Sequence, residues 1–210
     1  MTRILIADDH AIVRKGLVQI LTDGHDTFVV DEAESGEEAL RKALDNDYDL
    51  VLLDISMPGK GGLDVLKELK SHNPDLPALI LSIHPEEQYA VRALRSGASG
   101  YLTKGSAADE LASAIRKVLA GGKYISSSLA EKLAFGLVSD SEKPLHGTLS
   151  DREYQVMRLI ASGKTPRVIA EEMSLSVKTI STYRSRLLHK MRMKSNAELT
   201  HYAIQNSLVG

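Results

Sequence analysis

The sequence predicts two domains of different class, an α/β domain followed by a smaller all-α domain. In the first 120 residues, short apolar runs alternate with amphipathic helical patterns, whereas residues 148–210 contain helical patterns only. The charge is divided in the same way. Residues 148–210 hold 10 Lys/Arg and 5 Asp/Glu, a net of +5, while the remainder holds 16 and 23, a net of −7. Such asymmetry is typical of a protein with a charged partner, although a chance drift in surface charge would look the same.

The first domain is expected to be a parallel sheet covered by helices. Its strands are apolar throughout, as in sheets that are buried on both faces, and helices separate them regularly. Five βα units predict a doubly wound domain of the flavodoxin-like kind over residues 1–122. The expected strands are 4–7, 28–30, 50–53, 78–81 and 100–102, and the expected helices are 11–21, 37–44, 63–70, 86–96 and 108–120.

Composition excludes several classes of protein. The chain has 210 residues, 43% of them apolar, which is enough to bury a real core. The absence of cysteine excludes disulfides and thiolate metal sites. There is no apolar run of about 18 residues, so no membrane span is expected. The first residues read as a strand and not as a signal peptide, so a cytoplasmic protein is expected.

The second domain is predicted to contain a helix-turn-helix. Residues 123–147 are expected to be a linker with a weak helix, and the stretch 139–147 is polar and contains Pro and Gly. After it, Ser150 and Glu153 form a capping box, and Thr165 precedes a Pro at the first helical position. A short helix, a turn and a longer helix from Val177 to about residue 193 then predict a helix-turn-helix within residues 148–210.

Polar side chains follow four of the expected strands of the first domain. Asp8 and Asp9 end the first strand and Asp54 ends the third, while Ser82 and Lys104 follow the fourth and fifth. Because the carboxyl ends of parallel strands meet at one crevice, we expect these groups to lie together. Three carboxylates repel one another unless a cation lies between them, and a hard cation such as Mg²⁺ suits oxygen ligands.

This set of groups suits phosphoryl transfer to a carboxylate. Asp54 would be the nucleophile, while the metal and Lys104 would neutralise the phosphoryl oxygens. Each residue alone has a simpler interpretation: Asp54 as a strand cap, Lys104 as a surface lysine and Ser82 as a hydroxyl at the edge of the core. These residues occur in order along the chain, each at the end of an expected strand, and this favours phosphoryl transfer over the simpler interpretations. His10 and His84 are interpreted as local surface or capping residues.

Residues 1 to about 120 resemble the receiver domain of two-component response regulators. The resemblance rests on the Asp8–Asp9 pair, on Asp54 in DISMPGKGG, on Ser82 in LILSIH and on Lys104 in GYLTKG. It implies that a histidine kinase phosphorylates Asp54 and that Ser82 and Lys104 contact the phosphoryl group. It further implies that Mg²⁺ is held by Asp8, Asp9, Asp54 and the carbonyl group of Ser56. Tyr101 stands at the position of an aromatic switch, although simple packing would also explain it.

A basic helix is expected near the end of the chain. Residues 177–194 contain six Lys/Arg and no acid, and Ile180, Leu187, Leu188 and Met191 form an inward apolar face. Short hydroxyl side chains flanked by positive charge suit a DNA major groove, although a solvated basic face is the simpler alternative. The expected DNA contacts are Lys178, Thr179, Ser181, Thr182, Tyr183, Arg184, Ser185, Arg186 and Lys190.

Residues 148–210 resemble the LuxR-type helix-turn-helix of the NarL/FixJ family, and the TYRSR segment is similar to its GacA/UvrY branch. Tyr183 and Ser181 depart from the usual His and Lys of that family, so no base sequence is carried over. The resemblance implies that the last helix contributes a dimer contact. The residues concerned are Leu199, Tyr202, Ala203 and Ile204, although packing within their own domain would also explain an apolar face.

The sequence therefore predicts a DNA-binding response regulator and not an enzyme. Phosphorylation of Asp54 by a sensor histidine kinase would bias the receiver through Ser82 and the loop that follows it, and so control homodimerisation and sequence-specific binding to promoter DNA. Two alternatives stay open. Some phosphatases also form an aspartyl phosphate, but Ser56 stands where they carry a second aspartate. The chain could also act mainly through protein partners.

Overall fold

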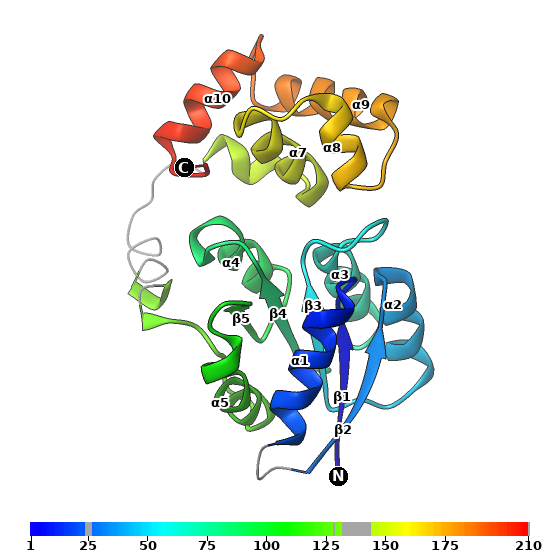
Figure 1. Ribbon diagram of the computed structural model, residues 1–210. Coiled ribbons are helices and arrows are strands. Elements are labelled where there is room, and N and C mark those ends of the chain that lie inside the picture. The colour runs from blue at the N-terminus through cyan, green and yellow to red at the C-terminus, as the bar shows by residue number, and fades with distance from the viewer. Residues whose placement is uncertain (24–26, 128, 132–143, 210) are drawn as a thin grey trace. The chain divides into compact units, whose positions relative to one another are not determined.

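The computed structural model describes residues 1–23, 27–127, 129–131 and 144–209 (Figure 1). The chain divides into two compact units, residues 1–138 and 139–210. Among the described residues, no helix is both long enough and apolar enough to cross a membrane.

The first unit is built on a five-stranded parallel sheet with the strand order β2-β1-β3-β4-β5. This sheet and the helices around it confirm the predicted flavodoxin-like fold (Figure 1). The strands are β1 (Thr2–Ala7), β2 (Phe28–Ala33), β3 (Leu50–Asp54), β4 (Ala78–Ser82) and β5 (Gly100–Thr103). The helices are α1 (Ala11–Thr22), α2 (Gly36–Asp45), α3 (Gly62–His72), α4 (Glu86–Arg95) and α5 (Ala107–Leu119).

A large apolar core lies between the sheet and the helices α1 and α5. Alternate side chains of the central strands, such as Ile4, Leu52 and Leu79, pack there against Leu17 of α1 and Leu111 of α5. Every residue of β3 and β4 is buried, because helices cover both faces of the sheet. This burial fixes where each strand ends, and therefore where the polar residues that follow it are placed.

The turn after β3 needs a glycine at residue 62. The backbone N–H of Gly62 donates to the carbonyl of Ile55, 3.1 Å away. A Cβ at this position would come within 2.0 Å of the Asp54 carbonyl oxygen, which is closer than any side chain can approach. The glycine therefore lets α3 begin directly against the end of β3 and holds Asp54 at the edge of the sheet.

The segment after α5 belongs to the first unit, where the sequence predicted the start of a linker. Tyr124 forms a parallel bridge with Gly100: its N–H donates to the Ser99 carbonyl at 2.9 Å and its carbonyl accepts from the Tyr101 N–H at 3.2 Å. This pairing covers the free edge of β5. Residues 127 and 129–131 are helical, as the weak pattern predicted, whereas the stretch 132–143 of the predicted linker lies outside the described residues.

The second unit consists of short helices that cross one another (Figure 1). They are the 3₁₀ helix η1 (Leu145–Thr148), α7 (Asp151–Ala161), α8 (Pro166–Glu172), α9 (Val177–Lys190) and α10 (Asn196–Gln205). Ser150, Thr165, Ser176 and Ser195 cap the four α-helices, each accepting a backbone N–H three residues on. The helix α9 ends before the predicted residue 193, because Arg192 takes a positive φ of 55°.

Candidate functional site

The groups predicted to form one site do meet at the carboxyl ends of the strands. Asp8 and Asp54 are buried, with 0% and 1% of their surface exposed, and Ser82 is also fully buried. Asp9 is half-buried at the rim. Parallel neighbours place β1 beside β3 and β3 beside β4, so the strand ends bring these side chains to one edge.

Lys104 lies between two of the carboxylates. Its Nζ is 2.6 Å from Oδ2 of Asp8 and 3.1 Å from Oδ2 of Asp54, and its side chain is only 12% exposed. Burial alone would lower the pKa of Lys104, but the charges of Asp54 and Asp8 outweigh it and raise that pKa. The lysine is therefore a fixed cation beside the buried carboxylate of Asp54.

Asp54 itself is held in an unfavourable environment for an anion. Burial raises its pKa, the charge of Asp8 adds to this, and the charge of Lys104 opposes it. Its Oδ1 accepts no hydrogen bond from the residues that the structure describes. A buried carboxylate oxygen without a donor has the character of an atom that awaits a ligand or a reaction partner.

Carboxylate oxygens of Asp8, Asp9 and Asp54 and a ring nitrogen of His10 all lie within 4.8 Å of one another. Oxygen donors of this kind at this spacing fit a hard divalent cation such as Mg²⁺. Arg14, which the sequence analysis missed, supports this edge. Its side chain is 6% exposed, and its Nη1 donates to the Asp8 carbonyl at 2.8 Å. The sequence offered one signal for this role of Arg14: it lies three residues before Leu17, on the face of α1 that is buried.

Two carboxylates at the end of β2 accept hydrogen bonds from the Arg14 guanidinium group. Its Nε donates to Glu32 at 3.0 Å and its Nη2 donates to Glu34 at 2.6 Å. Both acids lie at or just after the end of β2, about twenty residues along the chain. Arg14 thereby ties α1 and β2 to the strand end that carries Asp8.

Tyr101 links β5 to the loop between β4 and α4. Its ring is 1% exposed, and its hydroxyl donates to the carbonyl of His84 at 2.8 Å. The N–H of His84 donates in turn to Oγ of Ser82 at 3.0 Å. His84 also lies 3.4 Å from the Ser56 hydroxyl through its Nε2. This role of His84 was not predicted from the sequence, where its place two residues after Ser82 was a signal.

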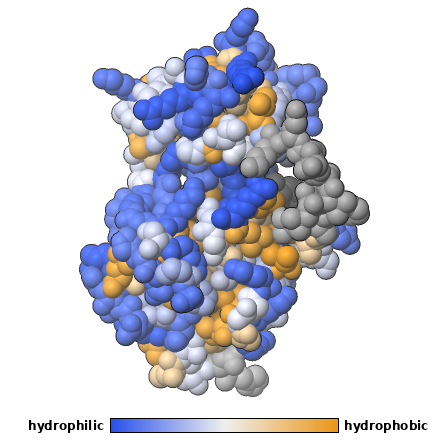
Figure 2. Space-filling view, turned by 180° about the vertical axis from the view of Figure 1, so that it is seen from behind, coloured by the Kyte–Doolittle hydropathy of each residue, from blue (hydrophilic) through white to orange (hydrophobic). Residues whose placement is uncertain are grey.

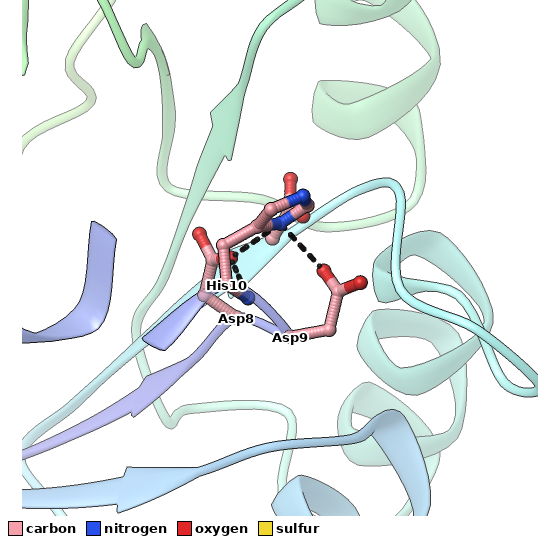
Figure 3. Close-up of side chains that lie close together, drawn as sticks. Asp8, Asp9 and His10 are labelled. Carbon is pink, nitrogen blue, oxygen red and sulfur yellow. Dashed lines mark hydrogen bonds and ion pairs between the residues drawn. The ribbon is translucent and has the colours of Figure 1, made fainter. Parts of the chain in front are cut away.

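His10 also has a larger role than the surface or capping role predicted for it. His10 stands at the N-cap of α1, but its side chain makes no capping hydrogen bond. Its backbone N–H donates to Oδ1 of Asp8 at 2.9 Å, and its ring turns back over the acids (Figure 3). The ring Nδ1 lies 3.3 Å from Oδ1 of Asp8 and 3.0 Å from Oδ1 of Asp9. Adjacency in sequence to an acidic pair was the signal that could have found it.

The helix α9 presents the predicted polar side chains while its apolar face is buried. Ile180, Leu187, Leu188 and Met191 are buried, as predicted from their spacing. Thr179, Tyr183 and Arg184 are half-buried, and the other predicted contacts are exposed: Lys178, Ser181, Thr182, Ser185, Arg186 and Lys190. Figure 2 shows that one face of this helical unit is largely hydrophilic, with few apolar side chains among the polar ones.

Two of the cations on α9 already have partners within the unit. Nζ of Lys190 lies 2.6 Å from Oε2 of Glu153, a carboxylate that is 4% exposed. Arg184 donates through Nε to Oδ1 of Asn196 at 2.7 Å. Lys190 therefore has a structural task in addition to any contact with an anionic partner.

The predicted dimer contacts on α10 fall into two groups. Leu199 and Ala203 are fully buried inside the helical unit, which is the packing role that the sequence left open for them. Ile204 is 61% exposed, and Tyr202 is half-buried with its hydroxyl 2.9 Å from Nδ1 of His146. Of these four predicted residues, Ile204 and the exposed part of Tyr202 are accessible to a second protein.

Comparison with known proteins assigns both units. Residues 4–116 match the response regulator receiver domain, and residues 147–203 match the luxR family of bacterial regulatory proteins. The chain belongs to the response regulators. It is a response regulator of two-component systems with a receiver domain and a LuxR-type DNA-binding domain, as predicted.

Relatives of this response regulator match over its whole length. It is 39% identical to response regulator UvrY of Escherichia coli, covering 99% of this chain and 96% of the relative. It is also 39% identical to response regulator GacA of Pseudomonas protegens, covering 100% and 98%. RcsB of Salmonella enterica serovar Typhimurium, solved on the promoter rprA with the phosphomimetic BeF3⁻, has a TM-score of 0.64 and 27% identity, covering 96% and 97%.

Proposed function

We propose that Asp54 accepts a phosphoryl group from the phosphohistidine of a sensor kinase. The observation that carries this is the position of Lys104, which places a buried cation 3.1 Å from Oδ2 of a carboxylate whose other oxygen has no described donor. In the transfer, a carboxylate oxygen of Asp54 forms the new P–O bond. The P–N bond to the imidazole breaks, and the electron pair leaves with the nitrogen.

The residues of the site supply positioning and charge. Lys104 would neutralise a phosphoryl oxygen, because its Nζ lies 3.1 Å from Oδ2 of Asp54. The Ser82 hydroxyl could donate to another, because Ser82 ends β4, the neighbour of β3 in the sheet. Mg²⁺ held by Asp8, Asp9, Asp54 and the Ser56 carbonyl would supply the remaining positive charge. A phosphatase is less well supported, because Ser56 offers a hydroxyl where an acid would be needed to protonate a leaving group.

Transfer of label tests the acceptor. The full chain is incubated with Mg²⁺ and phosphoramidate, a small donor with a P–N bond, and the phosphoprotein is quantified by intact mass. We expect the wild type and Asp45→Ala, a change at an exposed aspartate of α2, to be labelled equally, and Asp54→Ala to carry no label. Equal labelling of Asp54→Ala would overturn the assignment.

We also infer that α9 enters the DNA major groove. The support is a helix whose apolar face is buried, whose short hydroxyl side chains are exposed and whose cations flank them. Lys178, Arg184 and Arg186 would contact phosphates. Ser181, Thr182, Tyr183 and Ser185 would face the bases. Thr179 and Lys190 would add contacts near the two ends of the helix.

The salt dependence of DNA binding tests these contacts. We expect Arg184→Ala and Arg186→Ala to weaken binding to all sequences and each to reduce the slope of log affinity against log salt by about one. Lys15→Ala, which removes a charge from the exposed side of α1, is the matched control and should leave the slope unchanged. A flat slope in the wild type would count against phosphate contacts, and would favour action through protein partners.

Phosphorylation is proposed to favour a homodimer on inverted half-sites, since a two-fold axis in the protein matches one in the DNA. Ile204 and Tyr202 on α10 are the predicted contacts that remain accessible. A regulator that receives phosphate from a kinase and binds promoter DNA would work in the cytoplasm. The receiver would comprise residues 1–122 together with the segment around Tyr124 that pairs with β5, and residues 148–210 would bind DNA.

A further inference from the structure

The ring of His10 lies over the carboxylates of Asp8 and Asp9 (Figure 3). Its Nδ1 points at both acids, 3.0 Å from Oδ1 of Asp9 and 3.3 Å from Oδ1 of Asp8. The ring is 63% exposed, so an ion from solvent can reach it, whereas the carboxylate of Asp8 is fully buried. This imidazole has no role in the proposed phosphoryl transfer.

The spacing of these three atoms matches the edge of a coordination sphere. Ligand atoms at about 2.1 Å from one ion lie about 3.0 Å apart in an octahedron and about 3.4 Å apart in a tetrahedron. The two distances from Nδ1 of His10 fall within this interval. One imidazole nitrogen and two carboxylate oxygens can therefore bind a single divalent ion with small movements.

Two hydrogen bonds already hold Asp8 and His10 in place. The N–H of His10 donates to Oδ1 of Asp8, and Arg14 donates to the carbonyl of Asp8 at 2.8 Å. Burial of Oδ1 of Asp54 without a described donor is independent evidence that this pocket takes a cation. The imidazole changes which cations the pocket prefers, because Mg²⁺ and Mn²⁺ favour oxygen ligands whereas Co²⁺, Ni²⁺, Cu²⁺ and Zn²⁺ also accept imidazole nitrogen.

We propose that His10 gives the acidic pocket a second binding mode, in which a borderline divalent transition metal is held by Nδ1 of His10 with the carboxylates of Asp8 and Asp9. Mg²⁺ would be bound by oxygen ligands alone and would not need His10. The pocket would thus distinguish the two classes of metal through one side chain. This inference rests on the metal site of the proposed function, and its test separates the two.

The test compares metals on the full, tag-free chain. Affinities for Ni²⁺ and Mg²⁺ are measured by calorimetry, and pulsed EPR with Cu²⁺ detects a coordinated imidazole through its nitrogen coupling. We expect His10→Gln to weaken Ni²⁺ binding about tenfold or more, to leave Mg²⁺ affinity within about twofold and to remove the nitrogen coupling. His72→Gln, at the end of α3 and remote from the strand ends, is the matched control and should change none of these.

Equal Ni²⁺ affinity in the wild type and His10→Gln, or nitrogen coupling that survives the change, would overturn the inference. An equal loss of Ni²⁺ and Mg²⁺ affinity in His10→Gln would overturn it too, since His10 would then only hold the acids in place. Ni²⁺ binding that depends on His10 in a chain that binds no Mg²⁺ would support it, and would count against the proposed role of Mg²⁺ instead.

Discussion

At the scale of single residues, the burial of Asp54 has a cost that can be measured. Its pKa in the folded protein is raised, chiefly by burial and further by Asp8, although Lys104 opposes the shift. The folded state therefore holds a proton on Asp54 more tightly than the unfolded state does. The free energy of unfolding consequently falls as the pH rises through the interval between the two pKa values.

Asp54→Asn should therefore stabilise the receiver. Near pH 7 we expect its free energy of unfolding to rise by roughly 1 kcal/mol, because a buried charge is removed while Lys104 keeps its partner Asp8. The gain should disappear below the ordinary pKa of an aspartate, where Asp54 is protonated in both states. Urea unfolding, followed by circular dichroism in the presence of EDTA, measures the free energy of unfolding near pH 7 and at low pH. Asp45→Asn is the control, and a gain that persisted at low pH would contradict this explanation.

At the scale of elements, the start of α7 is joined to the end of α9. The side chain of Ser150 accepts the Glu153 N–H, and Oε2 of Glu153 accepts the Ser150 N–H at 2.8 Å. The same oxygen lies 2.6 Å from Nζ of Lys190. Burial acts to raise the pKa of Glu153, but the hydrogen bonds from Lys190 and Ser150 outweigh it, so that this pKa is lowered.

Glu153→Gln should therefore destabilise the helical unit. A lowered pKa means that the stabilisation is complete above the ordinary pKa of a glutamate and is lost as the pH falls through the folded value. We expect a loss of about 1–2 kcal/mol near pH 7 that vanishes in acid. The thermal midpoint of this unit over a pH series measures it. Glu172→Gln, which breaks only the exposed pair with Lys164, should cost less than about 0.5 kcal/mol.

Tyr101 makes the corresponding link in the receiver, between β5 and the loop before α4. Tyr101→Phe keeps the buried ring but removes the hydroxyl that donates to the His84 carbonyl. We expect a loss of about 1 kcal/mol and faster amide hydrogen exchange at Ile83 and His84. Exchange at these amides that matched the wild type would show that the hydroxyl does not hold this loop. Tyr183→Phe, on α9, is the control.

At the scale of the whole molecule, the chain joins an acidic receiver to a basic helical unit, and assembly is the expected way to couple them. Addition of Mg²⁺ and beryllofluoride, which mimics a phosphoryl group, should raise the solution mass of the wild type from monomer to dimer. The same addition should leave Asp54→Ala a monomer, because the acceptor is missing. Light scattering at matched concentrations measures both. A shift of equal size in both proteins would show that assembly does not depend on Asp54.

Ile204→Asp, introduced into the otherwise wild-type chain, tests the accessible part of α10. Its side chain is 61% exposed, so the change should leave the fold intact while placing a charge in the proposed dimer contact. We expect weaker dimerisation on DNA without loss of phosphorylation. Dimerisation equal to that of the wild type would remove α10 from the proposed interface.

Local patterns in the sequence are enough to predict which polar groups form the site. Polar residues directly after apolar strands predicted that Asp8, Asp54, Ser82 and Lys104 would meet, because parallel strands end at one edge. The apolar spacing in the basic helix likewise predicted which side chains of α9 are buried. Both are consequences of local periodicity, which is written in neighbouring residues.

The pairing of charged groups, in contrast, depends on the folded arrangement of the chain. Arg14 bonds Glu32 and Glu34, and Lys190 bonds Glu153. Burial inside the helical unit separates Leu199 from the exposed Ile204. These outcomes depend on distances between segments far apart in the chain and on how far each charge is removed from water, and periodicity carries information about neither.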